Sequence, residues 1–253
     1  MMHFTHRLGL VSVSFRDREP EEILAQMKVA GLTCIEWGSD VHAPCRDLQR
    51  LERLAELQER YGIVCSSYGT YFKLGKHALS ELADYIAAAK ILGTDILRVW
   101  CGRKSGAEMT DAERLSLLDE CRRAAKIAEE NGVTLCTECH QSTFTERAAD
   151  AVWLMESVAS EHFKTYWQPF CGEDPMENLE RARILAPYAE YLHVFNWRGD
   201  KKLPLVDATE DWRAYLGCFD HPCTLLLEFM PRDTLEELPN EAAALERIMG
   251  GSV

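Results

Sequence analysis

The sequence lacks a long apolar run and lacks a surplus of positive charge. No window approaches the ~18 consecutive apolar residues of a membrane-spanning helix, and residues 1–7 show no charged segment leading into the apolar stretch of a signal peptide. Lysine and arginine number 28 against 41 aspartates and glutamates, so the net charge is −13. An acidic chain repels polyanions, which disfavours nucleic acid and anionic membranes as partners. We expect a cytoplasmic protein that acts on a small molecule.

The chain also lacks a linker, a low-complexity segment and a glycine-rich phosphate turn. The first apolar segment ends in Ser12-Val13-Ser14-Phe15-Arg16, which is not the turn that a doubly wound open sheet usually carries after its first strand. With 253 residues, 47% of them hydrophobic, the chain has material for one large core. Barrels of alternating strands and helices commonly occupy about 250 residues as one domain.

Cysteine, by contrast, is plentiful, with ten residues. Most lie inside apolar runs such as Thr33-Cys34-Ile35, where a free thiol behaves as a small hydrophobic group in a reducing compartment. The one motif-like spacing is that of Cys136 and Cys139. On a strand, residues three apart point to opposite faces, so these two thiols do not chelate one ion easily. We interpret the cysteines as structural.

Strand-like apolar segments alternate with helical segments along the whole chain. The strands are expected at 8–15, 34–38, 63–68, 95–100, 133–140, 165–168, 191–195 and 223–229. The helices are expected at 21–30, 48–61, 79–92, 110–131, 148–158, 178–186, 211–216 and 235–248. Such alternation predicts a parallel sheet, and eight units predict its closure into an α/β (β/α)8 TIM barrel. We expect residues 1–253 to form this single domain.

Two of the predicted strands are apolar runs that end in a glutamate. Glu138 ends the fifth, and Glu228 ends the eighth. A run of this kind is typical of a strand buried on both faces, so the charge must lie where the strand leaves the core. Because the active site of such a barrel forms where its strands end, the two carboxylates are expected to share one site.

Two further polar side chains end the strands between them, Gln168 in the sixth and His193 in the seventh. The ends of strands five to eight are neighbours around a barrel, so Glu138, Gln168, His193 and Glu228 can converge. A glutamate or a histidine alone at a strand end is usually a solvated or a core residue. Buried together, however, two carboxylates without a counter-charge are costly. The set suits a divalent ion with open positions for a ligand.

The other strand ends are expected to form the substrate-binding wall. Aromatic side chains are dense there, and we weigh a sugar-binding wall and plain core evenly for them. Arg98 has an alternative role as a partner of Asp95 or Glu36. The candidate substrate-binding residues from these strands are Glu36, Tyr68, Arg98, Trp100 and His140.

The order of a strand-five glutamate, a strand-seven histidine and a strand-eight glutamate resembles the xylose isomerase-like TIM barrel superfamily, the sugar phosphate isomerase and epimerase family. The similarity spans essentially the whole chain. It implies that Glu138, His193 and Glu228 are metal ligands, with Gln168 as the fourth where family members often have aspartate. It also implies that Arg198, in the segment after the seventh strand, contacts substrate.

The resemblance implies one bound divalent ion, Mn²⁺ in the first place, with Mg²⁺, Co²⁺ or Zn²⁺ as alternatives. Two positions depart from the pattern of ketose 3-epimerases within that superfamily. Cys171 lies where those enzymes tend to have histidine, and Phe144 lies where they have glutamate. An amide at Gln168 lowers the charge of the ligand set, so we expect weaker metal retention and a more electrophilic ion.

These observations predict a metal-dependent sugar isomerase or epimerase that acts on a ketose or a related polyol ketone. Glu138 and Glu228 are the expected acid and base, removing and returning a proton next to the carbonyl through a metal-bound enediolate. The alternatives are a lyase of the inosose dehydratase type and a sugar-binding homologue without turnover. A phosphodiesterase resembling endonuclease IV is disfavoured by the acidic charge and the few strand-end histidines. A homo-oligomer is possible.

Overall fold

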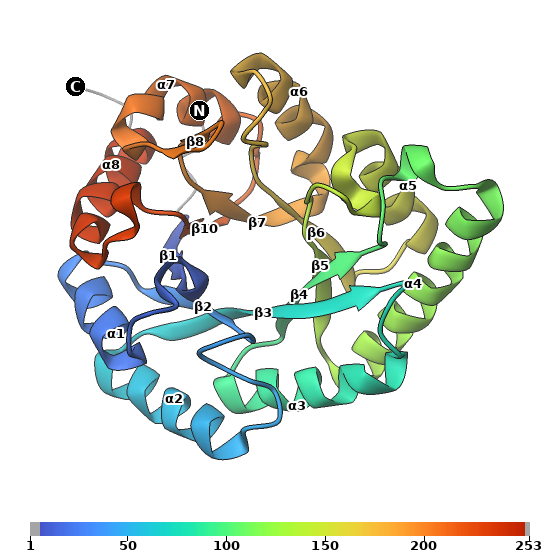
Figure 1. Cartoon of the computed structure of the whole chain (residues 1–253), viewed down its shortest axis with the longest axis horizontal. Coiled ribbons are helices and arrows are strands. Elements are labelled where there is room, and N and C mark those ends of the chain that lie inside the picture. Colours follow the sequence, from blue (N-terminus) through green and yellow to red (C-terminus); the bar gives the residue numbers. More distant parts are fainter. Residues whose placement is uncertain (1–5, 251–253) are drawn as a thin grey trace.

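Eight parallel strands close into a barrel in the computed structural model, in which residues 6–250 are described (Figure 1). The hydrogen-bonded order runs β1-β10-β7-β6-β5-β4-β3-β2 and returns to β1. The (β/α)8 TIM barrel predicted from the alternation of segments is therefore confirmed. The barrel strands are β1 (Arg7–Val11), β2 (Cys34–Gly38), β3 (Val64–Leu74), β4 (Ile96–Cys101), β5 (Thr134–Thr137), β6 (Phe163–Trp167), β7 (Ala189–Val194) and β10 (Thr224–Leu227).

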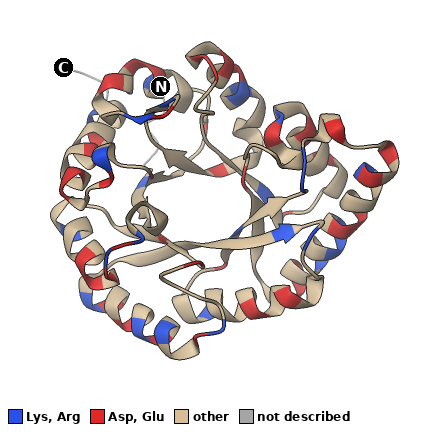
Figure 2. Ribbon diagram, in the orientation of Figure 1, with Lys and Arg blue, Asp and Glu red and all other residues tan. Residues whose placement is uncertain are grey.

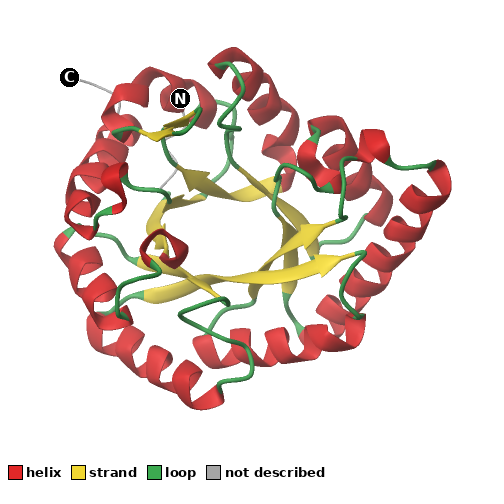
Figure 3. Cartoon of the chain, in the orientation of Figure 1, coloured by secondary structure: helices red, strands yellow, loops and turns green. Residues whose placement is uncertain are grey.

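Helices form an outer ring around the strands (Figure 3). In α2, for example, Leu51, Leu54 and Leu57 follow helical spacing and are buried, because they face the barrel. Charged residues of both signs are spread over the outer helices (Figure 2). The helices are α1 (Pro20–Val29), α2 (Leu48–Tyr61), α3 (Leu82–Leu92), α4 (Asp111–Asn131), α5 (Ala148–Val158), α6 (Pro175–Leu185), α7 (Thr209–Leu216) and α8 (Leu238–Gly250).

The first strand is shorter than its sequence pattern suggests. We expected residues 8–15 to be extended, but β1 ends at Val11 and Ser12–Phe15 forms a 3-10 turn. The hydroxyl of Ser12 accepts a hydrogen bond from the backbone N–H of Gly38, which ties the turn to β2. Alternating small polar and apolar residues fit both an extended strand and this turn, so periodicity alone misassigned the segment.

A short hairpin, absent from the sequence prediction, follows β7. It consists of β8 (Trp197–Arg198) and β9 (Lys201–Lys202), paired antiparallel. The backbone N–H of Gly199 at its tip donates to the carbonyl of Cys171 in the loop after β6. The hairpin is thereby attached to the end of the barrel where the strands terminate.

No helix within residues 6–250 combines the length and the apolar character needed to cross a membrane. The expectation about a signal peptide concerns residues 1–7, of which 1–5 lie outside the described residues.

Candidate active site

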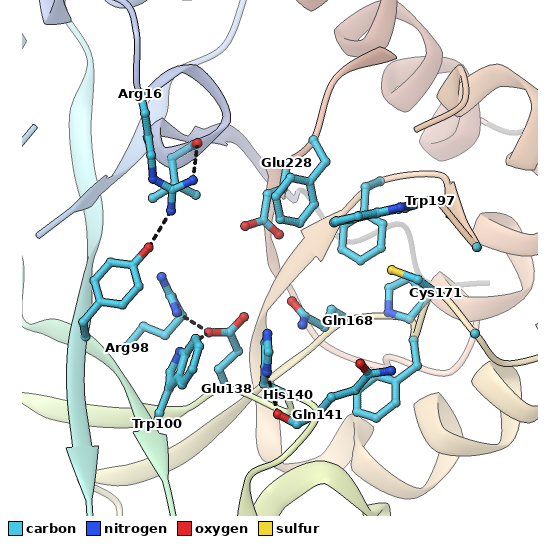
Figure 4. Close-up of a pocket in the computed structure, with 18 residues that line it drawn as sticks. Arg16, Arg98, Trp100, Glu138, His140, Gln141, Gln168, Cys171, Trp197 and Glu228 are labelled. Carbon is cyan, nitrogen blue, oxygen red and sulfur yellow. Dashed lines mark hydrogen bonds and ion pairs between the residues drawn. The ribbon is translucent and has the colours of Figure 1, made fainter. Parts of the chain in front are cut away.

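A cavity of about 570 Å³ opens at the carboxyl ends of the strands. Side chains from seven of the eight strand ends or the segments that follow them line it. Figure 4 draws these lining residues. Glu138 and Glu228 face each other across this cavity, with Gln168 between them (Figure 4). The tertiary structure thus brings both strand-end glutamates to one place.

The imidazole of His193 lies among the other three donor side chains. Its Nδ1 is 2.9 Å from Oε1 of Gln168, 3.4 Å from Oε2 of Glu228 and 3.9 Å from Oε1 of Glu138. His193 is fully buried, and the other three are at most 8% exposed. Three oxygens from three different strand ends therefore surround one ring nitrogen, which is an arrangement suited to a shared cation.

The orientation of Gln168 is set by the backbone. Its Nε2 donates to the carbonyl of Cys139 at 3.2 Å, which turns Oε1 toward His193. On the other side of the imidazole, Nε2 of His193 is buried without a hydrogen-bond partner among the described residues and is 3.6 Å from Oε1 of Glu36. A cation on Nδ1 would place the ring proton on Nε2, facing this carboxylate. That arrangement is common for metal-ligating histidines.

These observations fit a divalent ion, although not with the side chains as they lie. Within residues 6–250, no three His, Cys, Asp or Glu side chains are spaced to hold an ion by themselves. The set becomes complete only when the amide oxygen of Gln168 is counted and the two glutamates turn slightly toward Nδ1 of His193. Small rotations of the two carboxylates are sufficient to bring the four donors to one ion.

One oxygen of Glu138 is held by two donors from β4. Both the Arg98 guanidinium and the indole N–H of Trp100 donate to Oε2, the latter at 2.7 Å. Arg98 also donates through Nε to Oε1 of Glu36 at 2.8 Å, so one buried cation bridges two buried carboxylates. Burial alone would raise the pKa of Glu138, but Arg98 and His193 outweigh it and hold that pKa below its usual value. Glu138 is therefore fixed and ionised.

Glu228 lies in a different environment. Its carboxylate accepts no hydrogen bond from any described residue, although it is only 5% exposed. Burial, together with the charge of the neighbouring Glu138, raises the pKa of Glu228 to about 7 against the opposing effects of His193 and Arg98. The next residue, Phe229, has a φ of 56° and donates its backbone N–H to the hydroxyl of Ser14. This strained turn fixes the direction in which the strand end leaves the barrel.

Of the six predicted substrate contacts, three line the cavity and three do not. Arg98, Trp100 and His140 line the cavity, and His140 stacks on Trp100 with ring centroids 4.5 Å apart. Glu36 lies beneath the cavity, fully buried, where it accepts hydrogen bonds from Ser67 and Arg98. Glu36 does not line the cavity, so the structure does not place it where the sequence suggested a substrate contact.

Two more expectations need correction. The hydroxyl of Tyr68 donates to the carbonyl of Ala43, and its ring packs near Tyr85 of α3 in the core outside the barrel. Arg198 is half exposed, pairs with Asp211 of α7 and lines a smaller adjoining pocket instead of the main cavity. Tyr68 points away because the side chains of a strand alternate between its two faces.

Sequence reasoning missed Arg16, which also lines the cavity. It follows the 3-10 turn after β1. Its guanidinium donates to Asp40, to the hydroxyl of Tyr71 and to the carbonyl of Val13. The only signal was its position after the first strand, and the misplaced end of that strand concealed it.

The aromatic residues that the sequence left undecided divide between cavity and core. Those lining the cavity are Tyr71, Trp100, Phe195 and Trp197. Those that are fully buried in the core are Trp37, Tyr68, Phe72 and Trp167.

Comparison with known proteins gives a family and a fold. The model of the xylose isomerase-like TIM barrel family matches residues 24–222. An inosose dehydratase from Geobacillus kaustophilus (strain HTA426) is 32% identical over 135 residues, which are 51% of this chain and 42% of that protein. The chain therefore matches less than half the length of this relative.

Two solved structures share the fold across nearly their whole length. The probable 3-DHS dehydratase of Bacillus anthracis has a TM-score of 0.79 at 16% identity, with 95% of this chain and 98% of that chain covered. A xylose isomerase-like TIM barrel protein from Mycobacterium smegmatis, in complex with magnesium, has a TM-score of 0.73 at 15% identity, with 98% of each chain covered. At such identities the likeness concerns the fold alone.

Proposed function

The chain belongs to the xylose isomerase-like TIM barrel family, and from that premise we propose that it is a divalent-metal-dependent enzyme that isomerises or epimerises a neutral polyhydroxy ketone. The observation that carries the proposal is the convergence of three oxygens on Nδ1 of His193 at the floor of an open cavity. The named relatives are an inosose dehydratase and a probable 3-DHS dehydratase, which supports an enzymatic role.

Glu138, Gln168, His193 and Glu228 would hold the ion. When bound, a divalent cation polarises a carbonyl oxygen and stabilises the negative charge that develops when the adjacent C–H bond is broken. The magnesium complex of a structural neighbour supports a divalent metal, and Mn²⁺ remains our first choice among such ions. The carbonyl and the neighbouring hydroxyl of the substrate are expected to lie above this floor.

Hydrogen bonding gives the two glutamates unequal roles. Oε2 of Glu138 is occupied by Arg98 and Trp100, so this residue serves mainly to hold charge in place. The carboxylate of Glu228 has no such partners and faces the cavity. We therefore assign the removal of the proton to Glu228, and its return to Glu228 or, on the opposite wall, to Glu138 after Glu138 has taken up a proton from solvent. His140 and Trp100 would pack against the substrate.

Dehydration is the second candidate. The matching inosose dehydratase and the structural neighbour named as a probable dehydratase both favour it. It begins with the same proton removal next to a carbonyl, after which hydroxide leaves from the neighbouring carbon and the proton completes a water molecule. Isomerisation keeps the mass of the substrate, whereas dehydration lowers it by one water, so mass spectrometry of the product separates the two reactions.

Proton exchange with solvent tests the proposed function directly. We expect the protein, supplied with Mn²⁺ in D₂O, to introduce deuterium into D-fructose, D-tagatose or 2-keto-myo-inositol, as detected by mass spectrometry. Removal of the metal with EDTA should abolish the exchange, and added Mn²⁺ or Mg²⁺ should restore it. A protein that only binds sugars would exchange nothing in any of these samples.

Metal affinity is expected to rise when Gln168 gains a charge. Gln168→Asp introduces the carboxylate common in the family, and Gln168→Glu adds it without changing side-chain length. Both should bind Mn²⁺ at least ~10-fold more tightly in a calorimetric titration, equivalent to about 1.4 kcal/mol, because a third carboxylate strengthens the attraction to the cation. Loss of the bond to Cys139 opposes the gain. Unchanged affinity in both variants would count against an ion at this position.

A further inference from the structure

The cavity is larger than the ketose that its floor would hold. At the ~30 Å³ that a water molecule occupies in the liquid, the ~12 non-hydrogen atoms of a hexulose take up at most roughly 360 Å³, and the ~23 of a disaccharide at most roughly 690 Å³. The cavity measures about 570 Å³ and continues into the small pocket beside Arg198. A monosaccharide on the floor would leave a substantial part of the space to water.

Aromatic rings bound the remaining space. Phe170, Trp197 and Phe229, which we call the aromatic wall, all line the cavity. The rings of Trp197 and Phe229 are 4.7 Å apart at 71°, and the ammonium of Lys202 lies 5.3 and 5.2 Å from their centroids on its way to an ion pair with Asp233. Rings packed edge to face in this manner hold one another in place beside the cavity.

Trp197 of the aromatic wall lies on the far side of the cavity from Trp100 (Figure 4). Trp197 comes from the β8–β9 hairpin, which is held to the loop after β6 by the bond from Gly199 to Cys171. The proposed chemistry does not use these residues. The hairpin thus adds a second binding surface beyond the strand ends themselves.

Electrostatics decide what the second surface accepts. The cations that line the cavity are Arg16 and Arg98, and both are paired. Arg16 donates to Asp40 and Tyr71, and Arg98 donates to Glu36 and Glu138. No lysine lines the cavity among the described residues. A phosphate or carboxylate group would find no free positive partner there and would face two glutamates instead.

We propose that the substrate is a neutral ketose that carries a second sugar ring, with the ketose on the metal-binding floor and the second ring against the aromatic wall. This inference rests on the proposed function. Flat aromatic faces pack on the C–H faces of a sugar ring, and binding energy from the part that does not react lowers the barrier at the part that does. The disaccharide is then a better substrate than the free ketose.

Solvent-deuterium exchange on matched ketoses tests this. The probes are D-fructose, D-fructose 6-phosphate and the four glucosylfructoses turanose, maltulose, leucrose and isomaltulose, which differ in the fructose oxygen that carries glucose. At least one disaccharide should exchange with a kcat/KM at least ~10-fold above that of D-fructose, and the phosphate should not. The inference is overturned if D-fructose exchanges as well as or better than all four disaccharides, or if D-fructose 6-phosphate is the best substrate. Either result leaves the proposed function intact. No exchange with any probe would overturn both.

A variant of the aromatic wall provides the second measurement. Trp197→Ala should reduce the ratio of disaccharide to D-fructose kcat/KM by about tenfold. The matched control is Trp153→Ala, which removes an indole of α5 that packs on Phe144 outside the cavity and should keep the ratio. Because a ratio is measured, a general loss of stability does not imitate the result. An unchanged ratio in Trp197→Ala would overturn the inference.

Discussion

Replacement of Glu228 by glutamine is expected to reduce metal-dependent proton exchange by roughly 10³-fold, the usual contribution of a positioned general base. Glu228 is buried at the cavity floor with no hydrogen bond to its carboxylate from any residue in 6–250. An amide keeps the oxygen that could bind a cation, as Gln168 does, but it cannot take a proton. The measurement is deuterium incorporation at saturating Mn²⁺, with saturation followed by the metal-dependent rise in melting temperature.

The control for this variant is Glu241→Gln. Glu241 is an equally buried glutamate in α8 that accepts a hydrogen bond from the backbone N–H of Leu205 and does not line the cavity. The Glu241→Gln variant should incorporate deuterium at a rate within about twofold of that of the unaltered protein, because the change is far from the site. Persistence of exchange in metal-saturated Glu228→Gln, within tenfold of the original rate, would show that another group removes the proton.

Replacement of Arg98 by methionine is expected to destabilise the fold by roughly 3–5 kcal/mol. Arg98 is 3% exposed and donates to Glu36 and Glu138, which are 0% and 5% exposed. The nearby carboxylates hold the pKa of Arg98 well above its usual value, and Arg98 holds the pKa of Glu36 below its own, in both cases against the effect of burial. Without the guanidinium, two buried carboxylates lose their counter-charge. Thermal unfolding in EDTA should show a fall in Tm of about 10 °C.

The double variant Glu36→Gln/Arg98→Met tests the physical cause. Removal of one orphaned charge should recover a part of the lost stability, so that the double variant melts above Arg98→Met alone. Two single effects that simply add would show that Arg98 contributes through packing of its alkyl chain and not through its charge. A Tm of Arg98→Met within about 2 °C of the unaltered protein would contradict the prediction altogether.

Local patterns in the sequence were sufficient for the architecture. Leucine spacing in α2 and the apolar run that ends in Glu228 depend only on neighbouring residues, so they predict a helix and a buried strand reliably. The pattern wrongly predicted an extended strand at Ser12–Phe15, where a hydrogen bond from the backbone N–H of Gly38 to the hydroxyl of Ser12 replaces strand pairing. That bond joins residues from two strands and leaves no local signal.

The residues that line the cavity were harder to predict than the four side chains that converge around His193. Tyr68 and Trp100 are both aromatic residues of barrel strands, yet one faces the outer helices and the other the cavity. Which face an individual residue takes depends on the register and bulges of its strand. β3 carries such an irregularity against β4 between Gly69 and Lys73. Two extra residues of β3 lie opposite this stretch of β4, and such an offset leaves no local signal in the sequence.

The sequence by itself determined the eight-fold alternation of strands and helices and the presence of polar donors at the ends of strands five to eight. Both follow from the spacing of apolar residues along short segments. Only the tertiary structure decided how the donors share their charges: Arg98 holds one oxygen of Glu138, Glu36 lies sealed beneath His193, and Glu228 is left free. Pairing of this kind depends on the closure and stagger of the barrel, which bring together side chains from strands far apart in the chain.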